Sequence, residues 1–268
     1  MGDMKLGVIG CGKMGAALVR GVVQQGACEP SDVYLYDSVV ACAEALAGEI
    51  DGAVIAEGAL DVAESADVVL VCVKPHNVVD LLGVLAGVQG DPLFVSIAAG
   101  VMLGKLESAL GGERRVVRVM PNTPALVGEG AAAFSKGSLA THEDGNVVEA
   151  LLGSVGLVKE VPEGLIDAVT GVSGSGPAYI YQVIEAMADG GVKVGLPRDT
   201  AYALAAQTVK GAAAMVLETG LHPGVLKDQV TSPGGTTIAA LAELEASGVR
   251  SAFIEAVGVA AARSKEMG

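Results

Sequence analysis

Up to about residue 160, the chain alternates short apolar runs with longer stretches in which apolar residues recur at helical spacing. The short runs are rich in Val, Ile and Leu, as is typical of strands buried on both faces of a sheet. They predict strands at residues 6–9, 33–36, 53–55, 67–73, 93–97 and 116–120, and the longer stretches predict helices at 14–25, 39–47, 78–86 and 102–110. Strands that alternate with helices indicate an α/β domain with a doubly wound, mostly parallel sheet. Two further β-like runs, 130–134 and 157–161, flank a helix near 143–152 and are expected to extend the sheet's edge.

After Glu163 only helical spacing remains. Ala-rich helices are predicted at residues 165–172, 178–194, 198–218, 223–230, 238–245 and 249–267. Gly just past one helix and Pro near the start of the next, as in Gly-Leu-Pro at 195–197, are typical of tight connections between helices. We therefore predict two domains, an α/β domain at 1–162 and an all-α domain at 163–268.

Composition argues for contact with a second subunit rather than with a membrane. Apolar residues make up 51% of the 268 residues, and the mean hydropathy is +0.53. The longest uncharged stretch, 168–184, contains Gly and Pro and falls short of the roughly 20 apolar residues that a transmembrane helix needs. Excess apolar surface in such a chain indicates subunit contacts, so we expect a homodimer or a larger homo-oligomer built from dimers.

Charge and cysteine spacing exclude other classes. The formal net charge of −14 argues against a nucleic-acid partner, which needs a basic surface. Cys11, Cys28, Cys42 and Cys72 are widely spaced and have no His nearby, so we predict free thiols and no metal site. The N-terminal residues lack the basic and apolar segments of a secretion signal, which predicts a cytoplasmic protein.

A glycine-rich segment, Gly10-Cys11-Gly12-Lys13-Met14-Gly15, stands between the first predicted strand and the first predicted helix. In this G-x-G-x-x-G pattern the first Gly allows a tight turn, the second lets the backbone approach a pyrophosphate, and the third lets helix pack on strand. The pattern and its context predict a site for NADH or NADPH. The expected contacts come from Ile9, Gly10, Gly12, Lys13, Met14 and Gly15.

Asp37 follows the second predicted strand, about where this fingerprint places a ribose-binding acid. A carboxylate there accepts hydrogen bonds from the ribose hydroxyls and repels a 2′-phosphate. Residues 38–47 include no Lys or Arg that could receive such a phosphate. The sequence therefore favours NADH over NADPH; the alternative role for Asp37 is to cap the following helix.

Three further loops follow the carboxyl ends of predicted strands, where ligands gather in such sheets. Val73, Lys74 and Pro75 form the first, Ala98, Ala99 and Gly100 the second, and Asn122 stands in the third. These residues are expected to contact the cofactor. Lys74 has the equal alternative of a solvated charge closing a strand.

The segment Thr231-Ser232-Pro233-Gly234-Gly235-Thr236-Thr237 comes just before the helix predicted at 238–245. Pro and the Gly pair indicate a turn, which would lead into a helix start with free backbone N–H groups and two Thr hydroxyls. Such a place suits a small carboxylate that carries a second polar group. An ordinary N-cap after a Pro-Gly turn is the alternative.

With both halves considered, the chain resembles the Δ1-pyrroline-5-carboxylate reductase family, which catalyses the last step of proline synthesis. The matching segments are VIGCGKMG (8–15), VKP (73–75), SIAAG (96–100), RVMPNTPA (118–125), GVSGSGPAYIY (171–181), HPGVLKD (222–228) and TSPGGTTIAALAELE (231–245). The resemblance runs nearly end to end, and seven segments in order make it specific.

The resemblance implies a Rossmann domain followed by a helical domain that dimerises, with the active site between them. It implies that Thr236 and Thr237 bind the carboxylate of pyrroline-5-carboxylate or proline, with Ser232 and the backbone of Gly234 and Gly235 nearby. It also places Glu163 where relatives contact the substrate ring. Many relatives have Asn where this chain has Gln229 and Cys where it has Thr231, so no contact is assigned to Gln229.

The residues also favour an imine over an alcohol as substrate. β-Hydroxyacid dehydrogenases resemble this plan but place a catalytic Lys four residues after the last Gly of Gly171-x-x-Gly174-x-Gly176, where this chain has Ile180. Alcohol oxidation needs such a proton acceptor, whereas a pyrroline nitrogen can be protonated before hydride arrives.

Hydroxyls remain to manage the proton on that nitrogen. We expect Thr237, and next Ser175, to make this hydrogen bond; for Ser173 and Ser175, capping of the following helix is the equal alternative. A hydroxyacid dehydrogenase and a dinucleotide-sensing module without catalysis are the competing functions.

Overall fold

The computed structural model describes residues 4–268 and divides into two compact units. The first contains residues 4–175 and Val259–Gly268, and the second contains Gly176–Gly258. The first unit therefore extends beyond residue 162, where we expected the α/β domain to end. The reason is that η3 (Glu163–Leu165) and α7 (Ile166–Val169) pack on strand β7 (Gly130–Lys136).

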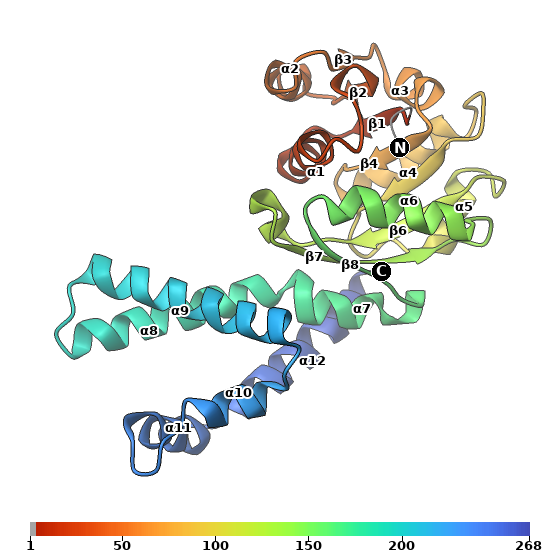
Figure 1. Cartoon of the computed structure of the whole chain (residues 1–268). Helices are drawn as coiled ribbons and strands as arrows, with labels where there is room; N and C mark the ends of the chain where they lie inside the picture. The colour runs from red at the N-terminus through yellow and green to blue at the C-terminus, as the bar shows by residue number, and fades with distance from the viewer. Residues whose placement is uncertain (1–3) are drawn as a thin grey trace. The chain divides into compact units, whose positions relative to one another are not determined.

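An eight-stranded sheet with the order β3-β2-β1-β4-β5-β6-β7-β8 forms the first unit (Figure 1). The other strands are β1 (Leu6–Ile9), β2 (Val33–Tyr36), β3 (Val54–Ile55), β4 (Val68–Val71), β5 (Leu93–Ser96), β6 (Val116–Met120) and β8 (Gly156–Glu160). Neighbouring strands are parallel except β6 and β7. The chain runs outward from β1 to β3 and then crosses to β4, which confirms the doubly wound sheet and its extension by β7 and β8.

Helices cover both faces of this sheet, and the strand residues alternate between the two layers. The helices are α1 (Lys13–Gln24), α2 (Val40–Glu49), α3 (Ala59–Ser65), α4 (Pro75–Leu85), α5 (Leu103–Ala109) and α6 (His142–Gly153). In β4, Val68 and Leu70 join the core formed with α1, α2 and α6, whereas Val69 and Val71 join the core formed with α3, α4 and α5. Each such side chain contributes roughly 1.5–3 kcal/mol when fully buried, so both layers hold the sheet.

Helix α3 is an element that the sequence pattern did not predict. It has only seven residues, too few for apolar periodicity to stand out. Asp61 in its first turn accepts a hydrogen bond from the backbone N–H of Glu57 at 3.0 Å, which fixes how the chain enters the helix. The start of α3 therefore has a defined position beside the carboxyl ends of β1 and β2.

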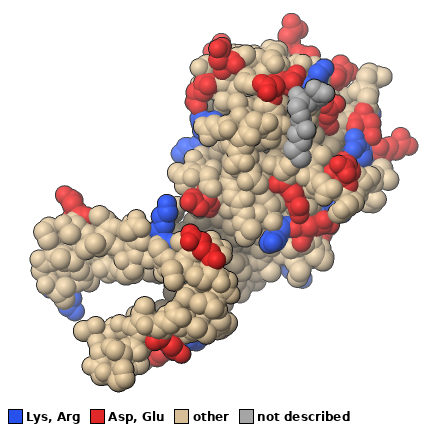
Figure 2. All heavy atoms as spheres, in the orientation of Figure 1, with Lys and Arg blue, Asp and Glu red and all other residues tan. Residues whose placement is uncertain are grey.

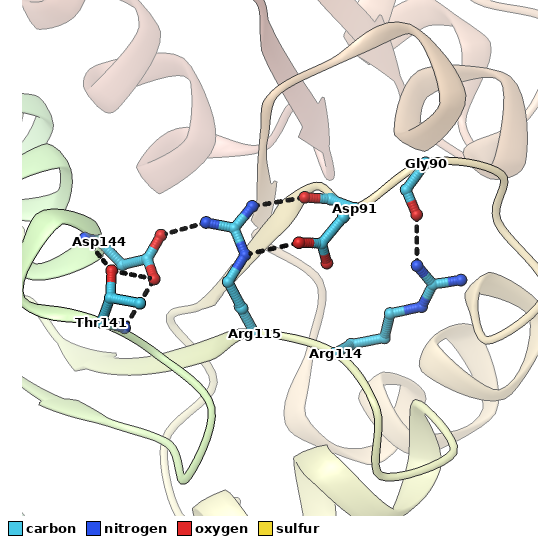
Figure 3. A network of polar contacts seen from close by, with 6 residues as sticks. All are labelled: Gly90, Asp91, Arg114, Arg115, Thr141 and Asp144. Carbon is cyan, nitrogen blue, oxygen red and sulfur yellow. Dashed lines mark hydrogen bonds and ion pairs between the residues drawn. The ribbon is translucent and has the colours of Figure 1, made fainter.

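A polar network closes the opposite, amino-terminal edge of β5 and β6 (Figure 3). Arg115 precedes β6, and its guanidinium pairs with the carboxylate of Asp91 at 3.0 Å and with the carboxylate of Asp144 in α6. Asp144 also accepts hydrogen bonds from the N–H and the hydroxyl of Thr141 at 2.7 and 2.8 Å, in a capping box that starts α6. The network joins two loops and a helix, so its role is to hold the fold together.

The second unit is built from helices alone, as predicted. They are α8 (Gly176–Lys193), α9 (Arg198–Thr219), α10 (Pro223–Gln229), α11 (Thr236–Ala246) and the first part of α12 (Val249–Met267). Helices α8 and α9 pack side by side after a turn at Gly195, whose φ of +106° suits glycine (Figure 1). Helix α11 starts before its predicted first residue, 238, because Gly235 already forms its N-cap.

This unit buries few apolar side chains of its own. Its core consists of Ala188, Ala201 and Ala205, whereas larger apolar residues such as Val194 and Leu217 are 82% and 75% exposed. Figure 2 shows few charged side chains on the visible face of α8 and α11, whereas acidic side chains are more frequent on the α/β unit. The helices thus carry an apolar surface that the described chain does not cover.

Among residues 4–268, none of the helices combines the length and the apolar character needed to cross a bilayer. In the same part of the chain, no group of three or more His, Cys, Asp or Glu side chains is arranged to hold a metal ion. The cytoplasmic location stays a prediction.

Candidate active site

The glycine-rich loop connects β1 to α1, and two of its glycines are required by the backbone itself. Gly10 has φ +104°, and a Cβ on it would lie 2.7 Å from the carbonyl carbon of Cys72. A Cβ on Gly15 would lie 2.1 Å from the carbonyl oxygen of Gly10. Both distances are too short for any side chain, so these positions hold the tight turn and the close approach of α1 to β1.

Gly12 differs, because a Cβ on it would meet no protein atom within 4 Å. Its φ of −69° is also open to other residues. Gly12 is the N-cap of α1, and no side chain caps that helix start, so the first N–H groups of α1 face the open space beside Gly12. A bare backbone that borders free space at a helix start fits a pyrophosphate. The loop therefore fits a dinucleotide, and α1 begins at Lys13, one residue before the predicted start, so that Lys13 and Met14 lie in its first turn.

Asp37 follows β2, and its carboxylate is already bound to the loop. Oδ2 accepts the N–H of Cys11 at 2.7 Å, and Oδ1 accepts the N–H of Val39 at 2.9 Å. Because a carboxylate offers about four acceptor positions, it can still receive ribose hydroxyls. Asp37 thus holds the loop, and its contact with a ribose stays a prediction.

A cavity of about 490 Å³ lies beside Asp37. It is lined by Ile9, Gly10, Tyr36, Asp37, Ser38, Gly58, Ala59, Leu60, Val73, Asn77, Leu81 and Val84. Asp37 is the only charged residue of this lining. The structure thus brings together four of the residues predicted to contact the cofactor, Ile9, Gly10, Asp37 and Val73, and it adds the start of α3, which sequence reasoning missed because α3 itself was missed.

The loop after β4 places two predicted cofactor residues outside this cavity. Lys74 is exposed and precedes α4, which begins with Pro75 in its first turn. Their cofactor contacts stay predictions.

The loop after β5 contains Ala98, Ala99 and Gly100. The Ala98 side chain is buried in the core, with 3% exposed, so the free surface of this loop comes from Ala99 and Gly100. Gly100 has φ +75°, which favours glycine at this position.

Cys11 lies within the glycine-rich loop as a free thiol. Burial, with a smaller contribution from the negative charge of Asp37, raises the pKa of the Cys11 thiol to about 12. Burial also raises the pKa of Cys72, beside the same loop. Because the thiolate is the reactive form, both cysteines are unreactive at neutral pH.

Two predicted site residues of the first unit have strong protein partners. Oε1 of Glu163 accepts the N–H of Leu103 at 2.6 Å and pairs with Arg118 at 3.0 Å. The Arg118 side chain is 3% exposed, so this ion pair is largely buried, and sequence reasoning did not single out Arg118. Asn122 is 8% exposed and uses both ends of its amide, toward Ser173 and Ala131.

Ser173 lies in a π-helical turn, Thr170–Gly174, and Ser175 is the C-cap residue of this turn. The Ser173 hydroxyl donates to the carbonyl of Val169 at 3.1 Å, so it does not cap the following helix. The N–H of Ser175 donates to the carbonyl of Thr170 at 2.8 Å, the spacing of five residues that defines a π-turn. Such turns are frequent at functional sites.

In the second unit, the turn at Ser232–Gly235 leads into α11. Gly234 has φ +69°, which favours glycine, and a Cβ on Gly235 would lie 2.3 Å from the Ser232 hydroxyl, so a larger residue there would require Ser232 to move. No side chain caps α11 at Gly235. The N–H groups of the first turn, which begins with Thr236 and Thr237, are therefore left for another partner. The alternative prediction, in which a Ser or Thr side chain caps this helix, does not hold here, because the N-cap residue is Gly235.

Comparison with known proteins agrees with this geometry. The family model for pyrroline-5-carboxylate reductase dimerisation matches residues 163–267, and the model for NADP oxidoreductases, coenzyme F420-dependent, matches residues 5–100. The structure is similar to that of a pyrroline-5-carboxylate reductase from Coxiella burnetii, with 34% identity, a TM-score of 0.94, and coverage of 99% of this chain and 98% of that one. A Plasmodium falciparum pyrroline carboxylate reductase with NADP bound has 33% identity, a TM-score of 0.87 and the same coverage.

Curated relatives extend over the whole chain. The pyrroline-5-carboxylate reductase of Methanosarcina acetivorans is 47% identical over 100% of this chain and 99% of its own length. That of Escherichia coli K12 is 44% identical over 99% of this chain and 98% of its own. With this identity over both units, the chain belongs to the pyrroline-5-carboxylate reductase family.

Proposed function

We propose that this protein reduces 1-pyrroline-5-carboxylate to L-proline, the last step of proline synthesis, with a hydride from a nicotinamide dinucleotide. One observation carries the proposal: the chain holds both a phosphate loop that only glycine can build and a second helix start that no side chain caps. The first suits a dinucleotide, and the second suits a small carboxylate. Because the chain belongs to the reductase family, we assign the glycine-rich loop and the start of α11 to one reaction.

The α/β unit holds the cofactor. When bound, the dinucleotide supplies the hydride, and the protein supplies position and electrostatics. The N–H groups at the start of α1 bind the pyrophosphate, because Gly12 leaves them accessible. Asp37 holds the loop through Cys11 and accepts hydrogen bonds from the ribose.

The helical unit binds the carboxylate of the substrate. The N–H groups at Thr236 and Thr237 bind the carboxylate, and Ser232 and the backbone of Gly234 and Gly235 shape the turn. The Thr237 hydroxyl hydrogen-bonds the ring nitrogen, and Ser175 is the second candidate for this role. Glu163 keeps Oε2 available for the substrate ring, since Oε1 binds Leu103 and Arg118.

We also propose that NADH is preferred over NADPH. The cavity beside Asp37 carries one negative charge and no Lys or Arg in its lining, so a 2′-phosphate there would be repelled. The test compares dissociation constants of both cofactors for the wild type and Asp37→Asn, which removes the charge at constant size. The NADPH-to-NADH ratio of dissociation constants should fall, and an unchanged ratio would contradict this preference.

A homodimer through the helical unit is part of the proposal. Exposed apolar residues such as Val194 and Leu217 need cover, and the matching family model describes dimerisation. Sedimentation equilibrium should give a dimer or a multiple of it. A monomer at micromolar concentration would contradict this assignment.

The function itself is tested by NADH consumption with pyrroline-5-carboxylate. Two parallel reactions address the alternatives: 3-hydroxy acids with NAD for a dehydrogenase, and cofactor binding alone for a sensor. Turnover of the pyrroline is expected. Folded protein that binds NADH but leaves the pyrroline unreduced would refute the proposed function.

A further inference from the structure

Asn122 occupies a position where its side chain should cap a helix, but it does not. It is the N-cap residue of η2 (Thr123–Val127), and Asn is among the residues most favoured there. No side-chain capping bond forms, and the residue is 8% exposed. The amide is instead directed to two distant segments, so its bonds point to a role other than starting η2.

The oxygen end of the amide continues the sheet. In the antiparallel pair of β6 and β7, Val119 faces Phe134 and Met120 faces Ala133, so the same register extended by two residues places residue 122 opposite Ala131. The Ala131 N–H donates to Oδ1 of Asn122 at 2.9 Å, in place of a backbone carbonyl. This bond fixes the side chain at the carboxyl end of β6.

The nitrogen end holds the π-helical turn. Nδ2 of Asn122 donates to the carbonyl of Ser173 at 3.1 Å. In an α-helix this carbonyl would accept the N–H four residues later, but that residue is Pro177, which has none. Asn122 therefore supplies a donor in place of the one that Pro177 lacks.

Side chains pack closely against the same turn. A Cβ on Gly174 would lie 2.6 Å from the terminal methyl of Met120 and 3.4 Å from the Thr170 methyl. The turn thus lies against the last residue of β6 while Asn122 holds its carbonyl. Ser175, the next residue, is positioned by these contacts.

We propose that Asn122 is a positioning residue for the reduction, which acts by fixing the turn that presents Ser175 rather than by binding the dinucleotide through its side chain. This replaces the role that we expected for Asn122 as a cofactor contact. It rests on the proposed function, in which Ser175 is a candidate hydrogen-bond partner of the substrate nitrogen.

The test uses Asn122→Asp in the full-length protein. The variant keeps the size and the acceptor for Ala131 but places an oxygen against the Ser173 carbonyl. Since a shift of about 1 Å can cost on the order of 100-fold in rate, kcat should fall by up to that factor. The NADH dissociation constant should stay within about twofold, because no cofactor contact is lost. Amide hydrogen exchange should accelerate at 173–175 and not at Ala131.

The decisive measurement is made in a variant that already carries Ser175→Ala. If Asn122 acts through Ser175, adding Asn122→Asp to Ser175→Ala should lower kcat little further. The matched control is Gln25→Glu, since Gln25 donates a similar amide bond to the carbonyl of Ser154 at 3.3 Å; its kcat should equal that of the wild type.

Three results would overturn the proposal: NADH affinity that falls in parallel with kcat, exchange at 173–175 that is unchanged, or a full additional loss of kcat in the Ser175→Ala background. If Asn122→Asp does not fold, Asn122→Ala is measured by the same criteria except exchange at Ala131, which should then accelerate as well because its acceptor is removed. Absence of pyrroline turnover by the wild type would refute the proposed function instead, and the exchange measurement would still test the contact.

Discussion

Alanine at Gly12 and at Gly15 should separate cofactor binding from folding. Both glycines belong to the same loop, and the substitution adds the same methyl group. At Gly12 the new Cβ meets no protein atom within 4 Å, whereas at Gly15 it lies 2.1 Å from the Gly10 carbonyl oxygen. The two variants should therefore fail in different ways.

The magnitudes follow from these surroundings. Gly12→Ala suits a φ of −69°, and the smaller unfolded-state entropy contributes about 0.4–1 kcal/mol of stability, but Ala is a poorer N-cap residue than Gly by a similar amount, so the free energy of unfolding should change by less than about 1 kcal/mol. Gly15→Ala should cost about 3 kcal/mol, the upper range for overpacking, because the atom it meets is backbone. The higher helix propensity of Ala offsets about 1 kcal/mol of this cost, which leaves a net loss of stability of about 2 kcal/mol. For a chain of this size that loss lowers the Tm by about 4–8 °C.

Cofactor affinity, in contrast to stability, should fall strongly in Gly12→Ala. The added methyl stands in the space that the pyrophosphate enters. An overpacking cost of about 1–3 kcal/mol raises the NADH dissociation constant roughly 5- to 150-fold. Thermal unfolding without ligand and NADH fluorescence titration measure the two quantities. Wild-type NADH affinity in Gly12→Ala, or a Tm loss there as large as in Gly15→Ala, would refute the reasoning.

Three further predictions concern the substrate turn, the ion pairs and the buried thiol. Thr237→Val should lower kcat with pyrroline-5-carboxylate at least about tenfold while the Tm changes little, because it removes one hydroxyl at nearly constant volume; equal activity would mean that backbone N–H groups suffice. Arg115→Ala leaves Asp144 buried without its cation and should cost about 1.5–3 kcal/mol in urea unfolding, whereas Arg20→Ala breaks an exposed pair and should cost about 0–1 kcal/mol; similar losses would contradict this ranking. The Cys11 thiol has its pKa raised from 9.0 to about 12, so its contribution to stability is complete below pH 9 and is lost as the pH rises toward 12; Cys11→Ala should reduce the fall of Tm over that range, and identical pH profiles would contradict it.

The elements that the sequence predicted well share strong local patterns. The strands β1, β2 and β6 and helix α12 begin and end where the apolar pattern placed them, because each is a run of buried or periodic residues. Helix α3 was missed because it is short. For the same reason, the sequence did not indicate that residues 58–60 line the cavity beside Asp37. The start of α11 was placed late because Thr is a weak helix former, although Gly235 already serves as the N-cap.

The sequence by itself determined the sheet of alternating βα units, the helical second half, the phosphate loop and the family, since these depend on patterns within short segments. Only the tertiary structure decided which polar side chains are already bound. Asp37 holds Cys11 across 26 residues, Arg118 pairs with Glu163 across 45, and Asn122 reaches Ser173 across 51. No local pattern reports such partners, because they meet only when the strands are arranged side by side. The fold thereby separates residues that are free to meet a ligand from those that hold the site in place.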